Sequence, residues 1–334
     1  MSFLRGFASK LTSAAAGASA GSVTASASLR VTLPPAARMR YTLCRNRWHL
    51  DSREPVSVIL LHDMLRSSHA VAPITAAITR MPATGHCPTL PLDVYAPDLR
   101  YHGRTAVTPA MQPEAPPTSS SMVLEHVSDV VRFASSSVVE FPQAIHLVGV
   151  GHGARVALAA AAACPGAFRS VTAIDAAADE AATSALLNAL RQLPSDVSKE
   201  TLATLAAKAK AAIPHEQDRL DVLADFAEPG TANGHTGSWR RASLDAFADT
   251  AAAHAWPAKE LAAAKFDGPV LSIGKRFDAA LPEVLAAHVD PARVTTQQLP
   301  ADAPADRVLD VFLRVHALHG EVENVVNVAC GDGY

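Results

Sequence analysis

The stretch Gly149-Val150-Gly151-His152-Gly153 decides how this chain folds. The apolar run 144–148 before it has the composition of a short buried strand, and the alanine-rich run 154–163 after it has that of a helix ending near Pro165. A strand, a glycine-flanked turn and a helix make up the G-x-S-x-G motif, which in enzymes exposes a nucleophilic serine. Because glycine occupies the middle position here, the sequence predicts the turn without its nucleophile.

Apolar runs alternate with helical patterns along most of the chain. Strands are expected at 38–50, 56–61, 94–98, 144–148, 170–175, 268–274 and 294–299. Helices are expected at 69–80, 123–139, 154–163, 282–288 and 307–318. This alternation is typical of a parallel sheet covered on both faces, so we expect an α/β fold with a doubly wound, mostly parallel sheet.

The patterns also suggest how the chain is divided. A long helical stretch between two predicted strands indicates an inserted cap. The expected parts are an N-terminal extension (1–45), a first core part (46–177), a helical cap (178–262), a second core part (263–319) and a C-terminal tail (320–334).

Composition and charge exclude several classes of protein. Hydrophobic residues make up 49% and charged residues 18%, which is a globular composition. The net charge of −3 gives no general attraction to phosphate backbones, so no direct nucleic-acid binding is expected. No stretch reaches the ~18 uninterrupted apolar residues of a membrane span. Motifs for nucleotides, zinc and calcium are absent from the sequence, so no cofactor and no metal are expected.

The first fifty residues have the composition of a targeting segment. They contain no Asp or Glu, seven Lys or Arg, and many Ser, Thr and Ala. Phe3, Leu4, Phe7 and Leu11 recur at helical spacing, with Arg5 off that face. This pattern is typical of a mitochondrial presequence, although a disordered tail of similar composition is an alternative.

The most specific motif of the chain is Asp98-Leu99-Arg100-Tyr101-His102-Gly103-Arg104-Thr105. It resembles the D-x-R-x-H-G-x-S turn of the α/β-hydrolases, in particular the abhydrolase-domain mitochondrial serine hydrolases and related bacterial esterases. Leu60-Leu61-His62-Asp63 resembles the L-H-G segment that begins the oxyanion loop of that family. Pro165 and Asp175 follow Gly151 by 14 and 24 residues, similar to the family's spacing.

An alternative register of the glycine turn centres on Gly153. It also places glycine at the nucleophile position, and it replaces the last glycine of the motif by Arg155. The spacing to Pro165 and Asp175 favours the register centred on Gly151, and the resemblance covers roughly residues 55–318.

The resemblance implies a catalytic triad, of which little remains. Gly151 stands at the serine position. The family's histidine follows the last strand, and no histidine occurs here from 289 to 315. Asp278 has the spacing of the family's acid, and Asp175 occupies an alternative acid position. Without their partners, both aspartates are expected to be surface or loop acids.

The oxyanion loop departs from the family as well. Asp63 replaces the usual glycine, and its carboxylate would repel a developing oxyanion. His152, next to the vacant position, is expected to point into the junction of sheet and helix, with its N–H facing the oxyanion site. His62 and His102 are expected to hydrogen-bond locally in structural turns.

These losses favour a catalytically inactive α/β-hydrolase-like protein that acts as a structural or accessory subunit. The presequence pattern places it in mitochondria, with the matrix as the expected compartment, and the expected partners are protein subunits of a mitochondrial ribosome or a respiratory-chain complex. A divergent esterase, thioesterase or lyase that uses displaced residues, such as His152 with Asp175, is one alternative. A non-catalytic module that binds an acyl or other apolar ligand is another.

Overall fold

The computed structural model describes most of the chain between residues 31 and 308. The described residues are 31–46, 56–80, 92–103, 105, 121–136, 139, 145–194, 200–226, 244–305 and 307–308. The expected C-terminal tail, most of the expected helix 307–318 and the first thirty residues lie outside them. No helix in the described part is long and apolar enough to cross a membrane.

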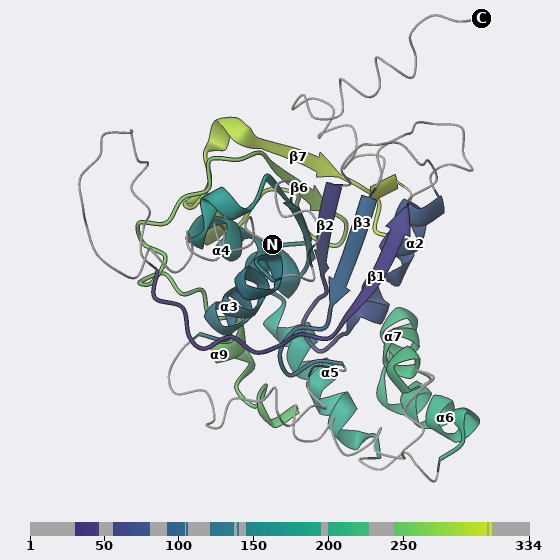
Figure 1. The fold of residues 1–334 in the computed structure, drawn as a ribbon. Helices are drawn as coiled ribbons and strands as arrows, with labels where there is room; N and C mark the ends of the chain where they lie inside the picture. Colours follow the sequence, from purple (N-terminus) through teal and green to yellow (C-terminus); the bar gives the residue numbers. More distant parts are fainter. Residues whose placement is uncertain are drawn as a thin grey trace, which may run out of the picture.

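A seven-stranded sheet forms the centre of the molecule (Figure 1). Its strands are β1 (Tyr41–Asn46), β2 (Val56–Leu61), β3 (Leu92–Pro97), β4 (Ile145–Val150), β5 (Ser170–Ile174), β6 (Val270–Gly274) and β7 (Val294–Gln298). Their order is β1-β3-β2-β4-β5-β6-β7, and only β1 runs antiparallel to its neighbour. The expected mostly parallel sheet is therefore confirmed, and the carboxyl ends of β2, β4, β5 and β6 meet at one edge.

Helices cover both faces of this sheet, which explains the continuous apolar runs of its central strands. On one face, Ile59 and Leu61 pack against α3 (Met122–Ala134) and α4 (His152–Ala163). On the other face, Val58 and Leu60 pack towards α2 (Ala72–Arg80), and Figure 1 shows α2 opposite α3 and α4. Alanine fills much of α4, and this allows the helix to lie close to the strands.

Between β5 and β6 the chain forms further helices, α5 (Glu180–Gln192), α6 (Leu202–Ala212), α7 (Glu216–Phe226) and α9 (Thr250–His254). Their apolar side chains share a cluster with Met64 and Leu65, which follow β2. An ion pair of 2.6 Å between Arg66 Nη2 and Asp218 Oδ1 also joins α7 to that loop. This helical layer thus lies over the edge at which the strands end. Further short helices in the described residues are η2 (Ser68–Val71), η5 (Pro165–Ala167), α10 (Glu283–Ala286) and η6 (Pro291–Arg293).

Residues 31–45, which the sequence patterns assign to the N-terminal extension, lie in the fold itself. Residues 41–45 belong to β1, and the extended strap 31–40 runs along α3. Arg100 donates from Nε and Nη2 to the carboxylate of Asp129 at 2.9 and 2.6 Å, and also to the Pro35 carbonyl at 2.7 Å. The N–H of Ala37 donates to the same carboxylate. Arg100 and Asp129 are buried, so this pair clamps the strap onto the core.

Asp129→Ala should destabilise the protein strongly, because it leaves the buried guanidinium of Arg100 without its closest carboxylate. We expect a loss of about 3–5 kcal/mol in the free energy of unfolding, measured by urea denaturation. Arg132→Ala is the control, since the exposed Arg132 also bonds the strap, at the Ala36 carbonyl, and should cost less than about 1 kcal/mol. Equal effects of the two substitutions would contradict the assigned role of the clamp.

Candidate functional site

The turn between β4 and α4 keeps the backbone of a nucleophile elbow. Gly151 has φ 55° and ψ −117°, and its N–H donates to the Ile174 carbonyl at 2.9 Å. Residues with a side chain rarely adopt this backbone conformation, whereas glycine adopts it without a steric cost. Gly149 and Gly153 lie so close to other backbone atoms that an added Cβ would overlap them. The three glycines therefore bring α4 tightly against the sheet.

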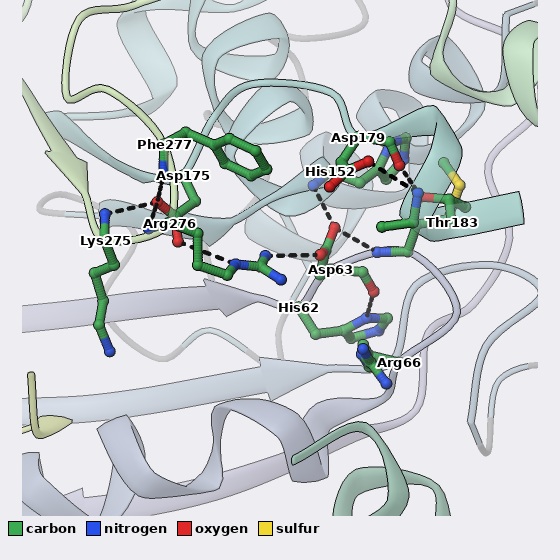
Figure 2. Close-up of polar contacts among 12 residues, drawn as sticks. His62, Asp63, Arg66, His152, Asp175, Asp179, Thr183, Lys275, Arg276 and Phe277 are labelled. Carbon is green, nitrogen blue, oxygen red and sulfur yellow. Dashed lines mark hydrogen bonds and ion pairs between the residues drawn. The ribbon is translucent and has the colours of Figure 1, made fainter. Parts of the chain in front are cut away.

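The carboxylate of Asp63 occupies the space above this turn. A Cβ at Gly151 would overlap the Asp63 carboxyl group, so the two side chains cannot share the site. Asp63 Oδ1 accepts from the N–H of His152 at 2.7 Å and from the N–H of Met64 at 2.8 Å (Figure 2). These two N–H groups, one after the turn and one from the loop after β2, are those that an elbow enzyme directs at an oxyanion. The chain's own carboxylate thus takes the place of the oxyanion.

Arg276 connects Asp63 to the neighbouring loop after β6. Its Nη2 lies 3.6 Å from Asp63 Oδ2, and its Nε lies 3.5 Å from Asp175 Oδ2. The Arg276 side chain is about half exposed, whereas that of Asp175 is 4% exposed. Because a partly exposed ion pair contributes little by itself, Arg276 mainly completes the set of contacts around Asp63.

Asp175 accepts hydrogen bonds from the backbone of the loop after β6. Its Oδ1 accepts from three successive N–H groups, those of Lys275 at 2.7 Å, Arg276 at 2.9 Å and Phe277 at 3.3 Å. The other predicted acid, Asp278, is exposed and accepts from the N–H of Ala280 at 2.9 Å. Both aspartates therefore have structural partners, and in the described part of the chain neither carboxylate is bonded to an imidazole.

Comparisons with known proteins identify the architecture. No family model and no curated protein matches this chain. Among solved structures, an esterase from a marine microorganism superposes with a TM-score of 0.54 at 13% identity, covering 87% of this chain and 99% of its own. This is the α/β-hydrolase fold. A thermophilic esterase from Thermogutta terrifontis (16% identity, TM-score 0.45, 86% and 94% covered) and epoxide hydrolase I from potato, Solanum tuberosum (12%, 0.47, 86% and 98%), also match.

Within this α/β-hydrolase fold, His62 and His102 stabilise turns, as the sequence predicts. His62 Nε2 accepts from the N–H of Leu99 at 3.0 Å, and His102 Nε2 accepts from the N–H of Leu65 at 3.0 Å. The opposite nitrogens donate to backbone carbonyls, at 2.8 Å for His62 and 2.7 Å for His102. Burial lowers the pKa of His102 well below its usual range, and the nearby His62 and His126 lower it further. Its imidazole is therefore neutral and has both nitrogens bonded.

His152 points away from the turn, towards α3. Its Nε2 lies 2.9 Å from Nδ1 of His126, a buried residue that the motifs did not single out. Burial lowers the pKa of His126 to about 3, and the charge of Arg100 acts in the same direction. Burial also lowers the pKa of His152, and its neighbours His126 and His254 lower it further. The side chain of His152 thus belongs to a buried pair of neutral imidazoles.

One Ser–His pair lies elsewhere in the sheet and was not expected. Ser170 Oγ and His146 Nδ1 are 2.7 Å apart, and both residues are buried. They are direct cross-strand partners at the starts of β5 and β4. The elbow lies at the carboxyl end of β4, and Asp63 follows the carboxyl end of the neighbouring β2. The pair has the hydrogen bond of a nucleophile and its base, but at the opposite edge of the sheet.

Restoring a side chain at the elbow should conflict with Asp63. Gly151→Ser is expected to lower the free energy of unfolding by more than about 2 kcal/mol, because it adds backbone strain and an overlap with the carboxylate. In an Asp63→Gly background the overlap disappears, so the same substitution should cost at least about 1 kcal/mol less. A double-mutant cycle by urea denaturation measures this coupling.

Gly166→Ser provides the matched control for that cycle. A Cβ at Gly166 would meet nothing within 4 Å, so serine should change stability by less than about 0.5 kcal/mol. Additive effects of Gly151→Ser and Asp63→Gly would show that Asp63 does not occupy the space of the nucleophile.

Proposed function

We propose that this protein is a catalytically inactive member of the α/β-hydrolase fold that serves as a structural or accessory subunit of a mitochondrial assembly. The observation that supports inactivity best is the position of the Asp63 carboxylate. Its Oδ1 accepts hydrogen bonds from the N–H groups of His152 and Met64. The carboxylate also fills the space that a side chain at Gly151 would occupy.

The energetic consequence of this position is large. Removing one oxyanion donor costs an acyl-transfer enzyme about 3–4 kcal/mol of transition-state stabilisation. Here both donors are already bonded to a negative charge, which would repel a second one. No histidine occurs from 299 to 315, the stretch that follows β7, and Asp175 bonds the backbone after β6. Nucleophile, base and electrophilic stabilisation are all unsupported at this site.

The mitochondrial part of the proposal has a different basis. The first thirty residues lack acidic side chains and carry three basic ones, Arg5, Lys10 and Arg30, as presequences do. The clamp between Arg100 and Asp129 holds residues 31–40 in the fold, so a presequence that is removed would end before this strap. Protein subunits of a mitochondrial ribosome or a respiratory-chain complex are the proposed partners.

A second candidate function is that of a hydrolase with displaced residues, for which Ser170 and His146 give the only specific support in the described part of the chain. The purified protein should hydrolyse p-nitrophenyl esters and acyl thioesters no faster than the matched variant Ser170→Ala. His152→Ala and Asp175→Ala should also leave the background rate unchanged. Turnover above background that disappears in any of these variants would overturn the proposal of inactivity.

The proposed role as a subunit is tested separately from activity. A tagged chain expressed in cells should be recovered from isolated mitochondria, migrate on native gels with a particle far heavier than its own 34.9 kDa, and co-purify with a fixed set of proteins. Mass spectrometry of that band identifies the host complex. Migration as a free monomer, or absence from mitochondria, would contradict this part of the proposal.

A further inference from the structure

Among the residues that the structure describes, three buried polar atoms near the elbow have no hydrogen-bond partner. They are Nδ1 of His152, Nε of Arg155 and Nδ1 of His254. The exposed fractions of these residues are only 1%, 5% and 5%. Because an unsatisfied buried polar group destabilises a folded protein, three such groups in one place require an explanation.

These three residues are neighbours in the fold. Arg155 lies one helical turn after His152 on α4, on the same face of the helix. Arg155 Nη2 donates to the backbone carbonyl of His254 at 2.8 Å. The rings of His152 and His254 have centroids 6.0 Å apart. The three residues therefore form one cluster between α4 and α9.

The bonds made by the other ring nitrogens determine what the unpaired ones carry. His126 Nε2 donates to a backbone carbonyl at 3.2 Å, so its Nδ1 accepts from His152 Nε2. Thr183 Oγ1 donates to a backbone carbonyl at 2.8 Å, so it accepts from His254 Nε2 at 3.0 Å. In neutral rings, Nδ1 of both His152 and His254 then has a free lone pair. Burial lowers the pKa of both imidazoles and keeps them neutral.

Arg155 brings a positive charge into this cluster. Within the described residues it forms no ion pair, and the exposed Glu180 acts on it only through its longer-range field. Its guanidinium carbon lies 5.8 Å from the centre of the Trp256 ring, which supplies a weak cation–π contact. A buried cation with so little compensation favours an anionic ligand, and the same charge disfavours a metal ion.

We propose that His152, Arg155 and His254 form a buried site for a small monovalent oxyanion that carries its own O–H group, such as hydrogen carbonate or dihydrogen phosphate. The negative oxygen accepts from Arg155 Nε, and the O–H donates to an imidazole Nδ1. An oxyanion without a proton would face two lone pairs. A water molecule would satisfy the hydrogen bonds but not the charge. This site does not depend on whether the protein is an inactive hydrolase.

Isothermal titration calorimetry on the full chain tests the site at a fixed neutral pH and ionic strength. Hydrogen carbonate and nitrate are the decisive pair, because both are flat monovalent oxyanions and only the first has an O–H. Hydrogen carbonate should bind at least about tenfold more tightly than nitrate, because nitrate leaves the buried imidazole lone pairs without a hydrogen bond. Phosphate is titrated in parallel, and its binding in addition to hydrogen carbonate, or in its place, supports the site and shows that it accepts the larger oxyanion.

Arg155→Met should weaken this binding at least about tenfold, because it keeps the length of the side chain and removes its charge. Arg293→Met removes an exposed arginine and should bind as the wild type does. If Arg155→Met fails to fold, the comparison of hydrogen carbonate with nitrate still tests the proposal. The proposal would be overturned if nitrate bound as tightly as hydrogen carbonate, or if neither hydrogen carbonate nor phosphate bound. It would also be overturned if folded Arg155→Met bound as tightly as the wild type, or if a crystal structure grown in hydrogen carbonate showed only water at these atoms.

Discussion

The carboxylate of Asp63 accepts hydrogen bonds from two backbone N–H groups, and these bonds hold the loops of this site together. The donors belong to the first residue of α4 and to the loop after β2, which are 88 positions apart in the chain. An anion is favoured at this place even without a ligand, since the first turn of a helix leaves its N–H groups without partners inside the helix and carries a partial positive charge. The carboxylate supplies that anion from within the fold.

The same carboxylate also connects the elbow to the loop after β6, at the same edge of the sheet. Arg276 lies between Asp63 and Asp175, and Asp175 in turn bonds three N–H groups of the loop after β6. Loops after β2, β4, β5 and β6 are therefore linked through two aspartates and one arginine. Contacts within the chain thus join these loops at one edge of the sheet.

The sequence predicts the architecture well because local patterns specify it. Apolar runs such as Val56–Leu61 predict the buried strands, and the glycines from 149 to 153 predict the turn at which α4 begins. The role of Asp63 could be anticipated only in part. A carboxylate near the oxyanion site follows from its position in the loop, but its place over Gly151 depends on the tertiary approach of two distant segments.

Other features carry no local signal at all. His126 is one of several polar residues on α3, and Arg155 lies on the alanine-rich α4. Only the packing of α3, α4 and α9 brings them to His152 and His254. The strap 31–40 is rich in proline and alanine, so it resembles an unstructured leader in composition. Its fixed position depends on the clamp between Arg100 and Asp129, whose partners come from separate elements.

Glycine at position 151 and aspartate at position 63 are physically linked. A serine at the elbow would hold a strained backbone at a cost of about 1–3 kcal/mol, and glycine removes that strain. Glycine alone would leave the two N–H donors to water. Asp63 satisfies both, and it fits only because position 151 has no Cβ. Each residue makes the other favourable, so substituting either one alone is opposed by the folded state. A serine side chain fits at this turn only when Asp63 is changed as well.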